Sequence, residues 1–303
     1  MSFLKPASTR NDSHCGWVGV GLRYPHYREA LEGTSSIDFV EIHAENFFAR
    51  GGQIRSLLEE IAQRYEISLH STSLGLGSAF GINAAYLGKL MELVTRIRPV
   101  LVSDHASFAW SSFAGHNVHA GDLLPLEFTE QSLSVLVDNV DRVQQTLGRR
   151  ILVENLSAYL DLGHSEMSET QYLTRLVERT QCGLLVDLNN LLVNGNNFGP
   201  GDPVSTAKQW LMDIPIESVG EIHLAGYSPV PEGELIIDDH SQAVSGECWD
   251  LYRFATKRFG PVMTLVEWDN ELPDWQTLLN EAEKARKIIA QTRSAEVEGV
   301  YES

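Results

Sequence analysis

The sequence predicts an α/β protein that folds as a single (β/α)8 barrel. Short runs rich in Val, Ile and Leu recur along the chain, and they are apolar on both faces, as strands buried in a parallel sheet must be. Eight such strands alternating with helices in about 270 residues suit a barrel, and no Gly/Pro/Ser-rich linker divides the chain. We therefore expect one domain over residues 1–303, with flexible tails at 1–15 and 293–303.

The predicted strands share large, often β-branched, apolar residues and end in polar ones. In chain order they are residues 16–23, 38–46, 67–71, 99–107, 150–156, 183–189, 221–226 and 263–269. The predicted helices place apolar residues three and four positions apart. They are residues 54–65, 83–97, 129–147, 168–180, 247–259 and 274–291. Gly148 is the expected C-cap of the third helix, and Ser168 with Gln171 is expected to form a capping box at the start of the fourth.

The charge and the cysteines exclude several classes of partner and site. The chain has 23 basic and 41 acidic side chains, a formal net charge of −18 at pH 7, which disfavours binding to nucleic acid or anionic membranes. Cys15, Cys182 and Cys248 form no CxxC pair and are odd in number, so neither a disulfide framework nor a cysteine zinc site is expected. The sequence contains no signal peptide and no stretch of about 20 apolar residues. We therefore expect a soluble cytoplasmic protein.

Polar side chains stand at the ends of the predicted strands or in the loops that follow them. In a barrel the carboxyl ends of the strands meet in one crown, so these side chains converge although they are far apart in the sequence. They are His43, Glu45, Asn46, His70, Asp104, His105, Glu154, Asn155, Asp187, Asn189, Asn190, His223, Asp238, His240, Glu267 and Asp269. A single such residue is usually a turn residue, but a buried group of carboxylates is costly unless a cation compensates it. The pattern therefore indicates a metal site.

The ligand types limit the metal without identifying it. Imidazole and carboxylate groups without thiolate suit zinc, manganese or non-haem iron. The candidates outnumber the ligands that one ion can use, which implies two or three ions. Zinc hydrolysis and iron redox chemistry both need open positions on the metal, so the ligand types leave this choice open. The remaining histidines fall in expected loops, where solvated surface positions are the default; they are His14, His26, His116, His119 and His164.

Nine collinear motifs resemble the DUF692 family, also called UPF0276, whose members are multinuclear non-haem iron-dependent oxidative enzymes. The motifs are VEIHAENFF at 40–48, LHS at 69–71, SDH at 103–105, GDLLPLEFT at 121–129, LVENLSAYL at 152–160, LLVDLNNLLV at 184–193, EIHLAG at 221–226, IDDH at 237–240 and TLVEWD at 264–269. The resemblance covers about residues 16–285. It implies a xylose isomerase-like barrel with two or three iron ions, in mixed Fe(II) and Fe(III) states, and O2 as co-substrate.

Carried over position by position, the resemblance also implies a set of metal ligands. They are His43, His70, Asp104, His105, Glu154, Asp187, Asn190, His223, Asp238, His240 and Glu267. Asp238 and Glu154 are the expected catalytic residues. Asp238 would be a ligand or a base that takes a substrate proton, and Glu154 would bridge two ions because a carboxylate has two oxygens. Asn190 stands where the Asp-x-x-His motif of the related endonuclease barrels has His, and Tyr227 stands where members of the family often have His.

The resemblance further implies a substrate and a partner. The substrate is a cysteine-containing precursor peptide made by the ribosome, and the partner is a small protein that recognises its leader segment and forms a heterodimer with the enzyme. Two outcomes occur in the family: oxazolone and thioamide formation in methanobactin biosynthesis, and excision of the cysteine β-carbon in 3-thiaglutamate biosynthesis. We favour excision from a carboxy-terminal cysteine. Residues 115–124 and 227–235 are expected to be loops at the rim where the peptide enters.

Other functions compete with this one. A zinc-dependent phosphodiesterase of the endonuclease-barrel type would use the same crown, but the net charge of −18 argues against a DNA substrate. A sugar isomerase would need a lysine near the metals, and all six lysines lie in the amino-terminal tail or in predicted helices. No GxGxxG fingerprint links a strand to a helix, so no nucleotide cofactor is expected. A metal-storing or scaffold barrel is the non-enzyme alternative.

Overall fold

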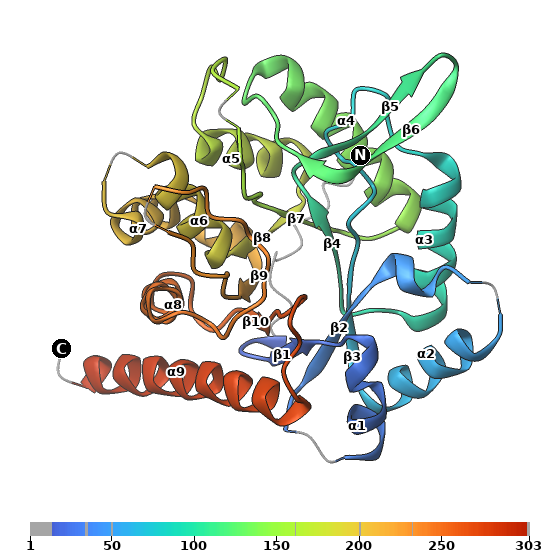
Figure 1. Cartoon of the computed structure of the whole chain (residues 1–303). Helices are drawn as coiled ribbons and strands as arrows, with labels where there is room; N and C mark the ends of the chain where they lie inside the picture. Colours follow the sequence, from blue (N-terminus) through green and yellow to red (C-terminus); the bar gives the residue numbers. More distant parts are fainter. Residues whose placement is uncertain are drawn as a thin grey trace, which may run out of the picture.

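The computed structural model describes residues 14–33, 36–49, 51–160, 162–199, 201–231 and 233–301, with side chains to residue 293. Its centre is a closed barrel of parallel strands surrounded by helices (Figure 1), which confirms the predicted fold class. The barrel strands are β1 (Val18–Gly21), β2 (Phe39–His43), β3 (Glu66–His70), β4 (Leu101–His105), β7 (Leu152–Glu154), β8 (Gly183–Asp187), β9 (Val219–Leu224) and β10 (Met263–Val266). Each pairs with the preceding and following barrel strand, and β10 closes on β1.

All six predicted helices are present. They are α2 (Gln53–Arg64), α3 (Ala84–Ile97), α4 (Glu130–Leu147), α5 (Glu169–Thr180), α8 (Gly246–Phe259) and α9 (Trp275–Tyr301). Both expected caps form, since Gly148 ends α4 with a φ of 64° and Ser168 shares a capping box with Gln171. α9 continues past the expected end at residue 291, so the tail expected from residue 293 is helical to Tyr301; residues 1–13, 302 and 303 lie outside the described residues. Within the described chain, no helix combines the length and the hydrophobicity that crossing a membrane requires.

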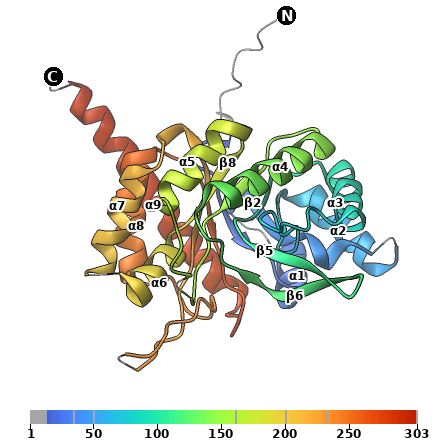
Figure 2. The same ribbon diagram turned by 90° about the horizontal axis from the view of Figure 1, so that it is seen from above.

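Several elements were not predicted from the sequence pattern. They are the helices α1 (Tyr27–Glu32), α6 (Leu188–Phe198) and α7 (Pro203–Asp213), the 3-10 helices η2 (Tyr24–His26), η3 (Ala44–Phe47) and η4 (Ile216–Ser218), and a hairpin of β5 (Phe108–Phe113) and β6 (His116–Leu124). The expected loop at 115–124 is therefore mostly a strand, and its exposed residues lack the apolar alternation that predicts one. The expected loop at 227–235 has no helix or strand among its described residues. The hairpin and the loop between β9 and α8 project from the same end of the barrel (Figure 2).

The barrel interior changes character along its axis. Near the amino-terminal ends of the strands, Phe39, Met263 and Leu265 form a buried apolar cluster. Successive residues of a strand alternate between the barrel interior and the helical layer, so every second residue of a strand faces inward. At the carboxyl ends these inward positions are ionisable, and the register of β2 and β3 places His43 beside His70. The fold thus separates an apolar end from a polar end.

Candidate metal centre

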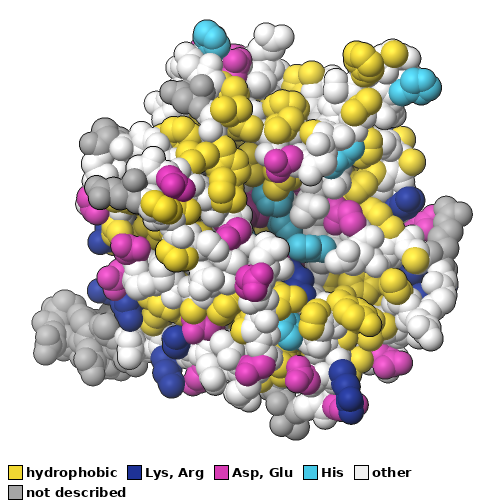
Figure 3. Space-filling view, in the orientation of Figure 1, with side chains coloured by type: hydrophobic (Ala, Val, Ile, Leu, Met, Phe, Trp, Pro, Cys, Tyr) yellow, Lys and Arg dark blue, Asp and Glu magenta, His cyan; other side chains and the backbone are white. Residues whose placement is uncertain are grey.

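Imidazole and carboxylate side chains gather at the carboxyl end of the barrel. Figure 3 shows histidine side chains in a hollow near the middle of this face. The cavity at this end has a volume of about 180 Å³. The predicted ligands in its lining are His43, His70, His105, Glu154, Asn190, Asp238, His240 and Glu267. Asp187 and His223 are fully buried and belong to ligand groups with these residues. The fold therefore brings together all of the predicted ligands except Asp104.

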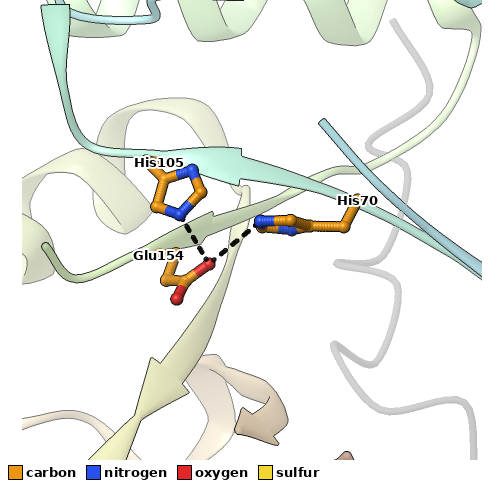
Figure 4. Close-up of side chains that lie close together, drawn as sticks. All are labelled: His70, His105 and Glu154. Carbon is orange, nitrogen blue, oxygen red and sulfur yellow. Dashed lines mark ion pairs between the residues drawn. The ribbon is translucent and has the colours of Figure 1, made fainter. Parts of the chain in front are cut away.

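The first ligand group consists of His70, His105 and Glu154 (Figure 4). Nε2 of His70 lies 3.5 Å, and Nε2 of His105 lies 3.3 Å, from the same Glu154 oxygen, Oε2, and that oxygen has no hydrogen-bond partner. Burial lowers the pKa of His70 well below its usual value and the pKa of His105 to about 4, so both rings are neutral at pH 7. Nδ1 of His70 is 2.8 Å from Ser103 Oγ. An Nδ1–H that donates to this hydroxyl leaves the Nε2 lone pair facing Glu154.

These contacts fit a shared metal ion. Two atoms bound to one ion at about 2.1 Å, in a tetrahedral arrangement, are about 3.4 Å apart. The two contacts of Glu154 with histidine nitrogens are 3.3 and 3.5 Å. Three further buried atoms close to this group have no hydrogen-bond partner: Asp187 Oδ2, Asn190 Oδ1 and His223 Nε2. Because buried polar atoms are normally paired, such a concentration of unpaired ligand atoms indicates a metal-binding site.

Four carboxylates, those of Glu41, Glu154, Asp187 and Glu267, each belong to more than one ligand group. The four further groups are Glu154–Asp187–His223, Asp187–His240–Glu267, Glu41–His43–Glu267 and Glu41–Glu221–His223. A carboxylate has two oxygens and can bridge neighbouring ions, so the groups form a connected series of candidate metal positions. Burial raises the pKa of Glu154 well above its usual value and the pKa of Asp187 to about 7. These shifts are the expected cost of burying several carboxyl groups without a metal ion to compensate them.

His223 and Glu267 form a close pair within this series. Nδ1 of His223 donates to Glu267 Oε2 at 2.9 Å, which leaves Nε2 as the ligand atom. Burial opposes a charge on His223, but the carboxylates of Glu41 and Glu267 outweigh it and raise the pKa of the ring well above its usual value. Burial likewise opposes a charge on Glu267, yet His240 and His223 hold its pKa well below the usual range. A metal ion at Nε2 would displace a proton from His223.

His43 differs from the other histidines because an arginine faces it. Nη2 of Arg23 lies 3.0 Å from His43 Nε2 and donates to Glu267 Oε1 at 3.2 Å, while Nε of Arg23 donates to Asp269 Oδ1 at 2.7 Å. Burial opposes its charge, but Asp269 and Glu267 raise the pKa of the guanidinium, so Arg23 is a resident cation in the crown. Arg23 was not among the predicted site residues, because a lone arginine at the end of a predicted strand carries no metal signal.

Asp238 lies at the edge of the cavity, on the loop before α8. Its Oδ1 accepts a hydrogen bond from Asn189 Nδ2 at 2.6 Å and lies 2.8 Å from His240 Nε2, and Ser157 Oγ donates to its Oδ2 at 3.3 Å. These contacts fix the carboxylate at the cavity surface, where it can serve as a ligand or as a base. Asn190 also lines the cavity, and its unpaired amide oxygen can bind a metal.

Asp104 is the predicted ligand that lies apart from the others. Its neighbours Ser103 and His105 face the barrel interior, so the alternation of β4 points Asp104 outward. Oδ2 of Asp104 accepts from Ser71 Oγ at 2.8 Å and from Leu74 N at 3.0 Å. Burial raises its pKa to about 8. Asp104 belongs to none of the ligand groups in the described part of the chain, and it ties the loop after β3 to β4.

Two buried glutamates inside the barrel were missed by the sequence analysis. Glu41 and Glu221 are fully buried, two positions before His43 and His223 on their strands. Both accept from Ser68 Oγ, at 3.4 and 3.5 Å, and burial raises the pKa of Glu221 to about 8. The signal was present in the sequence, because Glu-x-His on a strand places both side chains on one face.

His26 corrects a prediction about the histidines expected in loops. It is buried, and its Nε2 is 2.8 Å from the carbonyl oxygen of Pro273, so its role is structural. The other four histidines of that set are half-buried or exposed. No ligand group among the described residues includes any of the five.

The barrel and its connected ligand groups define a (β/α)8-barrel protein with a candidate multinuclear metal centre. The family described as "RiPP precursor modification enzyme MbnB/TglH/ChrH", where RiPP denotes a ribosomally synthesised and post-translationally modified peptide, matches residues 17–290. A UPF0276 protein of Vibrio vulnificus (strain YJ016) is 44% identical over 274 residues, which cover 90% of this chain and 91% of that protein. A UPF0276 protein of Chromobacterium violaceum is 43% identical over 276 residues, with coverages of 90% and 95%. The chain belongs to this family, DUF692 or UPF0276.

Solved structures with the same fold have low sequence identity to this chain. D-psicose 3-epimerase from Clostridium cellulolyticum has a TM-score of 0.54 at 11% identity and covers 92% of this chain and 98% of its own. Endonuclease IV from Thermus thermophilus has a TM-score of 0.53 at 14% identity, with coverages of 92% and 99%. A xylose isomerase domain protein from Alicyclobacillus acidocaldarius has a TM-score of 0.53 at 16% identity, with coverages of 91% and 99%. The predicted xylose isomerase-like barrel is therefore confirmed.

Proposed function

We propose that this protein is an iron-dependent enzyme that uses O2 to modify cysteine residues of a ribosomally synthesised peptide. The observation that carries the proposal is the connected series of ligand groups, in which Glu154, Asp187 and Glu267 each serve more than one group. Such sharing suits two or three adjacent ions, and imidazole with carboxylate suits non-haem iron. The family of peptide-precursor modification enzymes supplies the substrate class. Iron would supply the redox chemistry that amino-acid side chains lack.

The residues of the chain would have distinct tasks in this reaction. His70, His105 and Glu154 would hold one ion, and Glu154 would also bridge to the next position. Asp187 and Glu267 would connect the remaining positions in the same way. These groups are buried, and their low solvent exposure strengthens their electrostatic interactions with a metal. Mixed Fe(II) and Fe(III) states are part of the proposal.

Asp238 is the proposed catalytic residue at the substrate side of the centre. Its position at the cavity surface, fixed by Asn189 and Ser157, suits the transfer of a proton from the substrate or direct binding to an ion. Asp238→Asn would keep the shape of the side chain and remove its capacity as a base. That variant should retain its metal and lose turnover.

Among the reactions open to this site, we favour excision of the β-carbon of a carboxy-terminal cysteine, and formation of an oxazolone with a thioamide is the alternative. We also propose a small partner protein that binds the leader segment of the precursor and forms a heterodimer with the enzyme. A cytoplasmic location would suit the three free cysteines, since a reducing compartment keeps thiols unpaired.

Mass spectrometry of a peptide substrate tests the proposal. The gene's neighbourhood is first searched for a short cysteine-rich reading frame and a small partner gene. Protein purified without oxygen is then mixed with that peptide, with and without the partner, and exposed to O2. The expected result is an O2-dependent mass change at a cysteine, absent from a Cys→Ser precursor and from the Glu154→Gln variant. An unchanged precursor, together with zinc-dependent hydrolysis of bis(4-nitrophenyl) phosphate, would contradict the proposal and favour a phosphodiesterase.

A further inference from the structure

A second cavity lies beside the metal cavity, and the proposed reaction does not use it. We call it the apolar groove. It has a volume of about 340 Å³, and its main apolar lining residues are Leu126, Phe128, Leu156, Leu160, Leu162 and Phe198. Pockets that bind small ligands or side chains typically measure about 300–1,000 Å³ and have mostly apolar walls. The groove therefore has the size and composition of a binding site.

The apolar groove adjoins the metal cavity. Leu156 lines both cavities, and the groove residue Ala106 directly follows His105 of the first ligand group. Asn194 fixes the segment between the two cavities, since its Oδ1 accepts from Ala158 N at 2.8 Å and its Nδ2 donates to Leu156 O at 2.9 Å. A ligand that lies across Leu156 can therefore contact the metal centre and the groove at the same time.

Two large apolar side chains at the groove are left in contact with solvent. Leu160 is 66% exposed and Phe198 is 44% exposed. Figure 3 shows hydrophobic side chains gathered beside the hollow that contains the histidines. The acidic lining residue Glu169 is used within the protein, because it accepts from Trp210 Nε1 at 2.8 Å. The groove thus offers apolar contact, and an exposed apolar area of this kind is typical of an interaction site.

We propose that the apolar groove binds an apolar side chain of the peptide substrate, near in sequence to the residue that is modified. The inference rests on the proposed function, because it takes the substrate to be a peptide whose cysteine enters the metal cavity. An extended peptide advances by about 3.3 Å per residue, so side chains close to the cysteine reach a neighbouring cavity. Burial of one leucine side chain should strengthen binding by about tenfold.

Synthetic peptides of seven residues test this inference. Each has a fluorophore, a central cysteine and otherwise serine and glycine, and a single leucine occupies each of the other positions in turn. Binding to the metal-loaded full chain is measured by fluorescence anisotropy without oxygen. We expect at least one leucine position to raise the affinity about tenfold over the peptide without leucine.

Substitutions in the groove test whether its residues cause the gain in affinity that leucine gives. Leu160→Asp and Phe198→Asp should remove the leucine gain. Ile54→Asp on α2 is the matched control, since Ile54 is also 44% exposed but lies outside the groove, and it should keep the gain. All three positions are exposed, so the variants should fold, which circular dichroism and metal content verify. If an aspartate variant does not fold, the serine variant of the same position (Leu160→Ser, Phe198→Ser or Ile54→Ser) replaces it.

The outcomes separate this inference from the proposed function. Equal affinity for all peptides, or a leucine gain that survives both groove substitutions, would overturn the inference. A different result would also overturn the inference: no leucine gain, together with light scattering that shows a dimer in the unsubstituted protein and a monomer in Leu160→Asp. The groove would then join two copies of the chain. The absorption spectrum of the metal centre reports on the cysteine. If the spectrum changes with the cysteine peptide but not with a serine peptide, and no leucine position raises the affinity, only the proposed role of the groove is contradicted. If a leucine raises the affinity but the spectrum does not respond to cysteine, only the proposed function is contradicted.

Discussion

The two ends of the barrel interior are made by the same strands and have opposite chemistry. At the amino-terminal end, Phe39 on β2 and Leu265 on β10 are fully buried in an apolar cluster. Four residues after Phe39 comes His43, and two residues after Leu265 comes Glu267, both in the lining of the metal cavity. Strand alternation keeps each pair on the same face. These two strands therefore contribute to stability at one end and lead to the candidate site at the other.

The energetics of the two ends differ in the same way. Burial of apolar groups at the amino-terminal end stabilises the fold. At the carboxyl end, burial raises the pKa of Glu154 and Asp187, which means that their charged forms are costly to bury without a cation. A group of buried residues that lowers the stability of the metal-free protein indicates function rather than structure.

Glu154→Gln should give the largest effect, because this residue belongs to two ligand groups. The amide keeps the volume but cannot bridge two ions as a carboxylate does. We expect the loss of at least one ion per chain in elemental analysis, and a metal-free protein whose melting temperature is unchanged or higher. Full metal content in this variant would contradict the assigned ligand series.

Leu265→Ala tests the apolar end. The substitution removes a fully buried side chain and should lower the free energy of unfolding by about 2–5 kcal/mol. Metal content per folded chain should stay the same. Urea unfolding of the metal-free protein measures the free energy of unfolding, and elemental analysis measures the metal content. Loss of metal from a protein that remains folded would show that the two ends are not separate.

Ser103→Ala tests how the chain orients a ligand. The hydroxyl lies 2.8 Å from His70 Nδ1, and removal of such a contact typically weakens metal binding by about 10–100-fold. The number of ions bound at saturation should not change, which competition with a chelator can verify. Ser112→Ala, on the exposed hairpin, is the control. Equal metal affinities in the two variants would contradict a role for Ser103 in orienting His70.

The pH dependence of stability should distinguish the metal-free from the loaded protein. Burial raises the pKa of Asp187 to about 7 and of Glu221 to about 8, whereas both groups are ionised in the unfolded chain above about pH 5. Between about pH 5 and 8 these two groups thus hold more protons in the folded metal-free chain than in the unfolded chain, so their contribution to stability falls as the pH rises. Each extra proton contributes about 1.4 kcal/mol per pH unit. Thermal melts across this pH range, with and without chelator, measure the effect. The same dependence of melting temperature on pH in the metal-free and the metal-loaded protein would contradict it.

Sequence periodicity predicted the barrel because its strands are buried on both faces, and it predicted most of the site because the carboxyl ends of barrel strands converge. The prediction failed where the direction of a side chain determines whether it reaches the site. In SDH at 103–105, the alternation of β4 allows His105 inside only if Asp104 points out. Arg23 was missed because its importance depends on the spatial neighbours His43 and Glu267. The β5-β6 hairpin was missed because most of its residues are exposed and its apolar residues do not alternate with polar ones.

The central claim is that the polar end of the barrel is a multinuclear iron centre. Elemental analysis combined with Mössbauer spectroscopy of protein enriched in iron-57, and purified without oxygen or chelator, tests it most directly. The account predicts two or three irons per chain, part of them exchange-coupled, as expected for ions bridged by Glu154 and its neighbours. Stoichiometric zinc with negligible iron, after expression in iron-rich medium, would contradict it.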